Sequence, residues 1–577
     1  MRIKHSSIFA SISCSFYVLT LCWFAYSFQN GAIERGLFFN ADVLFFPSLF
    51  KNIILDGKHF SDWVFPPQSY LFPDVLLHAI AFLLSKNVFT QILVFAILQS
   101  ILFFCLISTL LSSFIHRSNA ISYSALIASN IILLGLYFPD PYGISFIEVT
   151  HFGSLLSFLI LLILLIKFLS AASVKEKYSV GTLTVILAIC SAISDRLILI
   201  QFVAPISLIG IYFSFARSKD KEILKFGILL IISYPLALLI GKLFLPEMGG
   251  LESGIGYGSV LNKLLMFVDW AFDKPWIIQL SIFIFPITLF TALLFLLRHR
   301  NNSDQRIVHK CLIATLILIS PALMLIVTGL SDREFTSRYL LPYFLLAPVF
   351  LFILLSATPS RILVFFLCLS SCLAIAANYG KREASPQPYT SYPEFIHCID
   401  ALAQKHGVTR GIAQYWDAIP IYVFSNAGLN VVPVLDDGSP MRVEYNASEF
   451  SGEFSFAVID NNAIGLYKIS RTAIERRLSK KPFEYQCNNK TVLIFDKETI
   501  TLPMQSALSD LRRSALESFV KNPRALLIMA QEESAKGNHE ASERLLSEAI
   551  SLLRQSGASE DTVKYYESVS EKHSLIK

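Results

Sequence analysis

The sequence predicts a multi-spanning α-helical membrane protein of about eleven transmembrane helices, followed by an extracytoplasmic α/β domain and a helical tail. Three observations carry this prediction. Hydrophobic residues make up 54% of the 577 residues and charged residues only 16%, whereas about a quarter of a soluble domain is charged. Apolar stretches long enough to cross a bilayer recur over the first two-thirds of the chain. After about residue 380 the hydrophobicity drops and a Pro/Ser-rich linker begins.

The expected transmembrane domain covers residues 1–380. Arg2 and Lys4 precede the first span, and no small-residue cleavage site follows it, so we expect the span to be retained rather than removed as a signal peptide. The apolar stretch 70–84 is shorter and is expected to form an interfacial or re-entrant helix. The expected spans lie near residues 8–28, 88–114, 120–137, 152–170, 180–194, 197–215, 222–245, 276–297, 311–329, 339–357 and 361–378.

Lysine and arginine predict the orientation of these spans. They gather in alternate loops, for example in "KEK" (175–177) and "RSKDK" (217–221). By the positive-inside rule these loops and the N-terminus are cytoplasmic, so "SAISDRLILIQF" between them forms a tight outer turn. The odd number of spans then places the C-terminal domain outside. Topology also accounts for the small net charge of +5, which does not indicate a nucleic-acid partner.

Residues 381–503 are expected to form the extracytoplasmic α/β domain. Cys398 and Cys487 are its only cysteines, and in an oxidising compartment they are candidates for a disulfide, although the sequence leaves their geometry open. Helical spacing is found in "PEFIHCIDALAQKHG" (393–407) and "RTAIERRLSK" (471–480). Strands are expected in "TRGIAQYW" (409–416), "LNVVPVL" (429–435), "FSFAVID" (454–460) and "TVLIFD" (491–496).

The tail, residues 504–577, is charged and helical. A single tetratricopeptide-like (TPR-like) repeat cannot bury its own apolar face, so we expect a helical hairpin docked on something else, with a protein partner as a candidate. A plain amphipathic hairpin remains the alternative. The small residues that fall near tetratricopeptide positions are Ala530, Gly537, Ser542 and Ala549.

The stretch "FFNADVLFFPSLF" (38–50) holds one carboxylate, Asp42, among aromatic and apolar residues. It lies in the expected first outer loop, residues 29–87, which also contains Asp74. This loop is too hydrophobic for a solvated linker, so we expect it to fold onto the membrane surface and form a cavity there. The alternative for Asp42 is a cap of a surface helix that follows it.

Other ionisable residues are expected on the same side. Glu148 and His151 belong to the second outer loop, and Asp195 and Arg196 occupy the tight turn. Charged residues near the membrane core usually line functional cavities. The alternatives are an exposed loop acid for Glu148, a helix-end residue for His151, and a structural ion pair between Asp195 and Arg196.

With these residues in view, the sequence resembles the GT-C superfamily of integral-membrane glycosyltransferases, which use polyprenyl-phosphate-linked sugars. Asp42, soon after the first span, matches the catalytic first-loop aspartate of that family. Arg338, Tyr339 and Pro342 in "SRYLLP" match its late-loop motif. The short tip that bears Asp195 resembles the tight outer loop in mid-chain, and "GIAQYWDAIPIYVFS" (411–425) resembles the entry to the outer domain of bacterial members.

The resemblance implies a bacterial inner-membrane enzyme with a cytoplasmic N-terminus and a periplasmic C-terminal domain. It implies that Asp42 is the general base and that Arg338 and Tyr339 contact the donor phosphate. The sugar stays open, as does the acceptor, which could be a lipid, a glycan or a protein. Val43 follows Asp42 where many members have a second acid.

Physical chemistry is consistent with these roles. A carboxylate in a partly dry cavity can deprotonate an acceptor, and arginine suits phosphate, which also makes Arg196 a candidate. We expect Asp195, Glu148, His151 and Asp74 to shape the cavity, either for the acceptor or for a divalent metal ion. Two other classes remain open: a transporter or lipid flippase, and a non-catalytic membrane scaffold whose outer domain binds partners.

Overall fold

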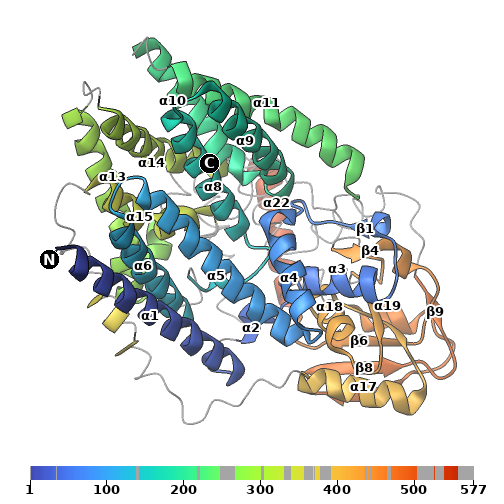
Figure 1. The fold of residues 1–577 in the computed structure, drawn as a ribbon. Coiled ribbons are helices and arrows are strands. Elements are labelled where there is room, and N and C mark those ends of the chain that lie inside the picture. The colour runs from blue at the N-terminus through green and yellow to red at the C-terminus, as the bar shows by residue number, and fades with distance from the viewer. Residues whose placement is uncertain are drawn as a thin grey trace. The chain divides into compact units, whose positions relative to one another are not determined.

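The computed structural model divides the chain into two compact units. Unit 1 comprises Met1–Pro393 together with Arg442–Asn446, and unit 2 comprises Glu394–Met441 and Ala447–Lys577. Figure 1 shows long helices in unit 1 and a sheet with flanking helices in unit 2. The structure describes the chain except at residues 1, 34, 138–141, 217–220, 247–266, 300–303, 330–338, 356–367, 370, 374, 377–391, 436–437, 442–443, 464–468, 503–525, 527–538 and 556–577.

Unit 1 is built from apolar helices, and the chain is a mostly helical membrane protein. Among the described residues, eight helices are long and apolar enough to cross a bilayer. They are α1 (Arg2–Gln29), α5 (Val88–Ser112), α6 (Arg117–Tyr137), α8 (Phe152–Ser170), α9 (Val174–Ser194), α11 (Lys221–Phe244), α13 (Trp276–His299) and α14 (Gln305–Gly329).

The remaining three expected spans have different outcomes. The expected span 197–215 is a π-helical turn, η5 (Leu199–Val203), that continues as α10 (Ala204–Ala216). The expected span 339–357 is the 14-residue α15 (Leu341–Leu354). The first is about long enough to cross the hydrocarbon core, whereas α15 is shorter than a straight crossing requires. The expected span 361–378 lies largely outside the described residues.

Small residues allow two of these helices to approach closely. A Cβ atom added at Gly210 on α10 would lie 2.9 Å from the Cα of Leu224 on α11. A Cβ atom added at Gly227 on α11 would lie 3.1 Å from the Cα of Ser207 on α10. In a membrane, packing of this kind replaces the hydrophobic driving force as the main source of helix association.

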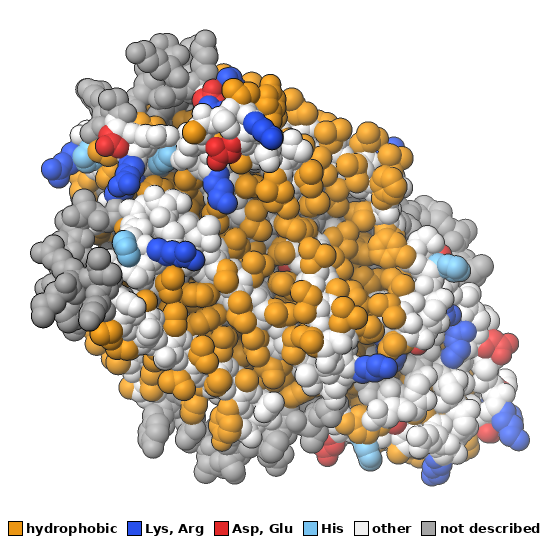
Figure 2. Space-filling model, viewed as in Figure 1, with side chains coloured by type: hydrophobic (Ala, Val, Ile, Leu, Met, Phe, Trp, Pro, Cys, Tyr) orange, Lys and Arg blue, Asp and Glu red, His pale blue; other side chains and the backbone are white. Residues whose placement is uncertain are grey.

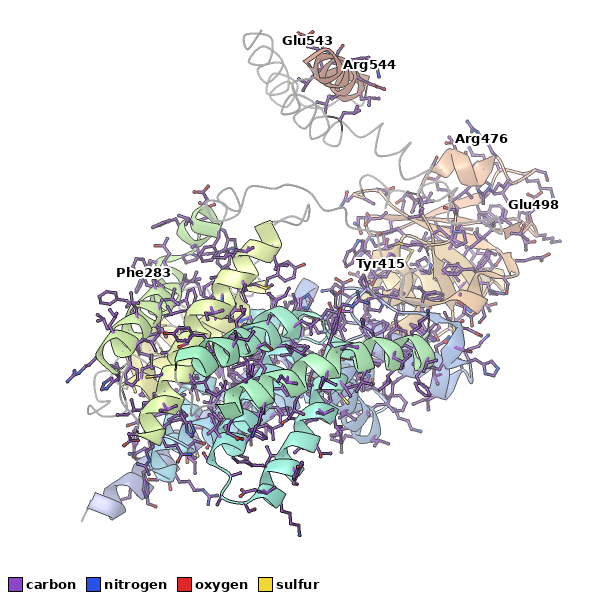
Figure 3. All side chains as sticks on the ribbon, turned by 90° about the horizontal axis from the view of Figure 1, so that it is seen from above. Phe283, Tyr415, Arg476, Glu498, Glu543 and Arg544 are labelled. Atoms are coloured by element: carbon purple, nitrogen blue, oxygen red, sulfur yellow. A yellow bond between two sulfur atoms is a disulfide. The ribbon has the colours of Figure 1, made fainter. Side chains whose placement is uncertain are left out.

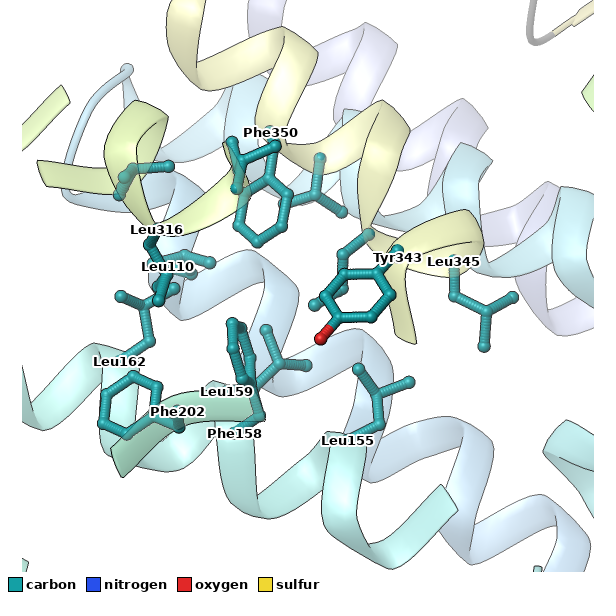
Figure 4. Packing of buried hydrophobic residues seen from close by; sticks show 14 of the residues in the cluster. Leu110, Leu155, Phe158, Leu159, Leu162, Phe202, Leu316, Tyr343, Leu345 and Phe350 are labelled. Atoms are coloured by element: carbon teal, nitrogen blue, oxygen red, sulfur yellow. The ribbon is translucent and has the colours of Figure 1, made fainter. Parts of the chain in front are cut away.

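The interior of unit 1 is packed with large apolar side chains (Figure 4). The hydroxyl of Tyr343 on α15 enters this interior and lies 2.6 Å from Ser320 Oγ on α14. Ser320 Oγ in turn donates to the backbone oxygen of Gln201 in η5. The outside is also apolar: Figure 2 shows a broad band of hydrophobic side chains. Phe283 on α13, with 57% of its surface exposed, belongs to this lipid-compatible outside (Figure 3).

The loop between α1 and α5 is folded rather than extended. Within this loop, β1 (Trp63–Val64) pairs antiparallel with β4 (Tyr445–Asn446). Asn52 Oδ1 accepts hydrogen bonds of 2.8 Å from Trp63 Nε1 and Asn446 Nδ2. Its elements are α2 (Arg35–Phe38), α3 (Phe45–Phe50), η1 (Lys51–Leu55), η2 (Phe60–Asp62), β1 (Trp63–Val64), η3 (Leu71–Val75) and α4 (Leu76–Leu84). One further short turn, η4 (Gly143–Phe146), follows α6.

Unit 2 contains a five-stranded mixed sheet of order β3-β2-β6-β8-β7. β2 runs parallel to β3 and β6, whereas β8 runs antiparallel to β6 and β7. These strands are β2 (Arg410–Ala413), β3 (Asn430–Pro433), β6 (Phe456–Asp460), β7 (Phe483–Cys487) and β8 (Lys490–Ile494). A separate antiparallel pair joins β5 (Glu453–Phe454) to β9 (Ile500–Thr501).

Helices complete unit 2. Cys398 on α17 and Cys487 at the end of β7 form a disulfide, with their Cα atoms 5.7 Å apart. The helices of unit 2 are α17 (Glu394–His406), α18 (Tyr415–Phe424), η7 (Ala447–Phe450), α19 (Arg471–Glu475) and α22 (His539–Gln555).

Within the expected hairpin tail the structure describes mainly α22. This helix is amphipathic: Leu546 and Ala549 are buried, whereas Arg544 is exposed (Figure 3). Ala530 and Gly537 lie outside the described residues, so the expected tetratricopeptide-like hairpin remains a prediction.

Candidate functional site

Five ionisable side chains from three separate segments meet inside unit 1. We call them the ionisable cluster, and each of them is mostly or fully buried. Two belong to the end of the first long loop, two to the segment between η4 and α8, and one follows α9 directly. They are Asp74, His78, Glu148, His151 and Asp195.

His151 and Asp195 form the best-defined contact of the cluster. His151 Nδ1 lies 2.7 Å from Asp195 Oδ2, a distance typical of a hydrogen bond to a carboxylate. Asp195 Oδ1 accepts a second hydrogen bond, of 3.0 Å, from the backbone N–H of Leu197. Both Asp195 oxygens are therefore engaged, and the carboxyl group is fixed where α9 ends.

His78 and Glu148 form a second contact, at 3.1 Å between His78 Nδ1 and Glu148 Oε2. At this distance the two buried groups interact electrostatically. Burial raises the pKa of Glu148, and the nearby His78 opposes this shift.

Asp74 lies between these two pairs. Its Oδ2 accepts a 3.3 Å hydrogen bond from the backbone N–H of Val149, and its Oδ1 lies against the first turn of α8. A Cβ atom at Gly153 would come within 2.5 Å of that Oδ1, so a glycine is needed there. Burial raises the pKa of Asp74 to about 8, and the charges of Glu148 and Asp195 add to the shift. Asp74 is therefore mainly protonated at neutral pH.

The backbone around the cluster is strained. Tyr70, Val149 and His151 have positive φ angles of 52°, 63° and 67°. Left-handed conformations are uncommon for residues other than glycine, and each costs about 1–3 kcal/mol. Such strain persists only where the surrounding structure enforces it, and it gathers at functional sites.

Hydrogen bonds to the end of α9 hold the loop in this conformation. The Ser194 hydroxyl donates to the backbone oxygen of Phe72 at 2.7 Å and accepts from the backbone N–H of Phe72 at 2.9 Å. The backbone N–H of Tyr70 donates to the Ser194 backbone oxygen, and Ser69 Oγ donates to that of Ile193. These bonds bring the first long loop and the turn at Asp195 together.

Two tyrosine rings lie close to His151. The ring centres of Tyr70 and Tyr339 each lie 5.6 Å from the His151 ring. Tyr339 belongs to the "SRYLLP" segment that precedes α15. Residues some 270 positions apart in the sequence thus contact one histidine.

The structure brings several of the candidate residues together. Asp74, Glu148, His151, Asp195 and Tyr339 converge, and Glu148 is buried, so the alternative of an exposed loop acid is wrong for it. Arg196 is exposed beside Asp195.

Asp42 lies half-buried in the first long loop. The helix that follows it begins at Phe45, with Leu44 rather than Asp42 at the cap position. The nearby Asn40 side chain instead accepts a hydrogen bond from the N–H of Val43. Arg338 lies outside the described residues, and its expected contact with phosphate remains a prediction.

His78 is the member of the cluster that the sequence did not indicate. It is fully buried and lies on α4, four residues after Asp74. Residues four apart lie on the same face of a helix. The spacing between Asp74 and His78 was therefore the feature of the sequence that could have indicated His78 as a member of the cluster.

The metal expectation has no support in the described geometry. Among the described residues, no three His, Cys, Asp or Glu side chains are arranged to hold a metal ion. The cluster instead forms pairs of an acid with a histidine, and a protonated Asp74 is a poor metal ligand.

The fold therefore defines the class of the protein as a helical membrane protein with a buried cluster of acids and histidines at loop level. In comparisons with known proteins, no model of a protein family matches the chain and no curated protein matches it significantly.

Proposed function

We propose that this protein is a glycosyltransferase that moves a sugar from a polyprenyl-phosphate donor to an acceptor at the outer face of a bacterial inner membrane. One observation supports it most: Tyr339, from the segment that resembles the donor-phosphate motif, lies against His151, which is bonded to Asp195. Segments that the GT-C resemblance assigns to one active site thus meet at one histidine.

In the proposed reaction an acceptor oxygen or nitrogen attacks C1 of the sugar. The bond from C1 to the phosphate oxygen breaks, and its electron pair stays on the phosphate. Asp42 takes the proton of the acceptor as general base. Arg338 and Tyr339 bind the donor phosphate, with Arg196 as a further phosphate ligand.

The disulfide of unit 2 supports the proposed location. Cys398 and Cys487 are bonded, and such bonds are typical of the periplasm and other oxidising compartments. In this orientation unit 2 is periplasmic, the donor lipid reaches the site from the bilayer, and the tail that contains α22 is available for a protein partner.

Replacement of Asp42 tests the proposal. Asp42→Asn removes the base while keeping the size of the side chain, and we expect transfer from radiolabelled undecaprenyl-phosphate sugars to fall by about 10²–10⁴-fold. The matched control is Asp62→Asn, a partly exposed acid of the same loop, which should keep wild-type transfer. Full activity of folded Asp42→Asn protein would eliminate the assigned base, and a wild type that transfers no sugar would favour a transporter or a scaffold.

A further inference from the structure

Among the ionisable cluster, His151 is the side chain that reaches the surface of the protein. Its side chain is 11% exposed, whereas the side chains of Asp195, Glu148 and His78 are 3%, 1% and 0% exposed. The other members can act on a substrate only through this histidine or after a rearrangement. The cluster therefore presents one ring to any bound molecule.

The orientation of that ring is fixed. Asp195 holds Nδ1 at 2.7 Å, and the left-handed backbone of His151 sets the direction in which the side chain leaves α8. A carboxylate on one ring nitrogen determines which nitrogen is left to meet a ligand, and here that nitrogen is Nε2. One directed polar atom is thus available at the opening of a buried polar network.

Beneath His151 the network is not saturated. Among the described residues, Asp74 Oδ1 and Glu148 Oε1 lack a hydrogen-bond partner although both side chains are buried, and Glu148 Oε2 contacts His78. Native proteins leave few buried polar atoms without a partner, and those that remain call for a functional explanation. Ordered water or a polar ligand bound close by would pair such atoms.

The surroundings of the ring indicate the chemistry of that ligand. The rings of Tyr70 and Tyr339 both lie close to that of His151, each at 5.6 Å between ring centres. Aromatic rings offer apolar faces that pack against the C–H groups of a sugar ring. A hydroxyl group can donate or accept, so it can bond Nε2 whether or not that nitrogen carries a proton.

We propose that His151 is a sugar-binding residue of the transferase, whose Nε2 hydrogen-bonds one hydroxyl of the transferred sugar beside the rings of Tyr70 and Tyr339. Asp195 acts through His151 and is a positioning residue. This inference rests on the proposed function and adds a source of donor specificity. A site that hydrogen-bonds a hydroxyl rejects the analogue that lacks it, because the polar atom of the site is then left unpaired.

The test compares donors with and without single hydroxyl groups. Undecaprenyl phosphate carrying mannose, glucose or arabinose, and each of their mono-deoxy forms, is offered to the full-length protein, and kcat/KM is measured for each donor. With the best donor, one deoxy position should lower kcat/KM of the wild type by ~10- to 100-fold. In His151→Asn, parent and deoxy donor should be used about equally.

His151→Asn suits this test because asparagine tolerates the left-handed backbone and its amide can still reach Asp195, while the substrate-facing nitrogen is gone. The ratio of two donors does not depend on how much of a variant is folded. Asp195→Ala, which releases the ring, should lower the same ratio in part. His59→Asn, an exposed histidine of the first long loop, is the matched control and should keep the wild-type ratio.

The outcomes separate the two proposals. Sugar transfer by the wild type together with an unchanged deoxy ratio in His151→Asn would overturn the sugar-binding role alone. Absence of transfer from every polyprenyl-phosphate donor would overturn the proposed function and this inference with it. Loss of the ratio in His151→Asn, but not in His59→Asn, would support both.

Discussion

Each unit of the molecule buries a group of charged side chains, and the two groups differ in how well their polar atoms are paired. In unit 2, Lys490 Nζ lies 2.7 Å from Asp417 Oδ1 and 3.0 Å from Asp460 Oδ2. The second oxygens of both acids accept hydrogen bonds from Gln414 and Asn462. We call Asp417, Asp460 and Lys490 the buried triad.

The ionisable cluster of unit 1 lacks this saturation. Within the described ranges, Asp74 Oδ1, the ring nitrogens of His78 and Glu148 Oε1 have no hydrogen bond, and three nearby residues have strained backbones. A fully paired polar network stabilises one conformation of a domain. A partly paired network costs stability, and proteins keep such a network mainly where a ligand or a function requires it. The buried triad thus has the full pairing expected of a structural network, whereas the ionisable cluster has the unpaired atoms and strained backbone typical of functional sites.

Removal of the cation from the buried triad should give the largest effect on stability. Lys490→Met leaves the buried Asp417 and the partly buried Asp460 without their cation and should destabilise unit 2 by about 3–5 kcal/mol. Protease resistance and thermal unfolding of unit 2 in the full-length protein would measure this.

The matched control for this prediction is Lys480→Met, an exposed lysine of the same unit, which should be nearly neutral. Adding Asp417→Asn and Asp460→Asn to Lys490→Met should recover much of the loss, since it removes the unpaired charges. A Lys490→Met protein as stable as the wild type would mean that the buried triad is not structural.

Asp74 should give the next effect, and it should depend on pH. Its folded-state pKa of about 8 lies above its ordinary value of 3.8 because the fold favours the protonated form. The stability from this protonation is fully present below the ordinary value and is lost as the pH rises through about 8. Asp74→Asn removes this dependence, so between pH 5 and 8 the wild type should lose on the order of 2–4 kcal/mol relative to the variant.

Melting temperatures of the detergent-purified protein across this pH range would test the Asp74 prediction. Asp62→Asn serves as control, since that acid is partly exposed in the same loop. Parallel pH curves for the wild type and Asp74→Asn would show that Asp74 is ionised in the fold, and would weaken the contrast between the two units.

Much of the fold could be predicted from the sequence because it depends on local composition. Eight of the expected spans are long apolar helices, and the four expected strands of unit 2 exist. β7 (Phe483–Cys487) was missed because most of its side chains are exposed, so it lacks the apolar alternation of a half-buried strand. The expected strand at 409–416 ends early, because Gln414 caps α18.

Less of the candidate site could be predicted, because its geometry depends on the path of loops. Asp74, Glu148 and Asp195 were singled out as separate acids, but nothing in the sequence shows that they interact. Their approach requires left-handed backbone at Tyr70 and His151, and neither is a residue type that marks such a turn. The long-range bonds of Ser194 that enforce this path are equally invisible in the sequence.

Two exposed ion pairs that share Arg471 give the prediction with the smallest expected effect, and they contrast with the buried triad. Arg471 lies 2.7 Å from Glu475 and 2.8 Å from Glu484, and all three side chains are at least one-third exposed. Water and salt screen such pairs, so Arg471→Met should cost less than about 1 kcal/mol, and high salt should reduce that cost further. The thermal unfolding assay used for Lys490→Met measures both variants. Arg471→Met and Lys490→Met could instead lower the free energy of unfolding by the same amount. Burial and full pairing would then not explain why the buried triad stabilises unit 2, and the contrast between the buried triad and the ionisable cluster would lose its physical basis.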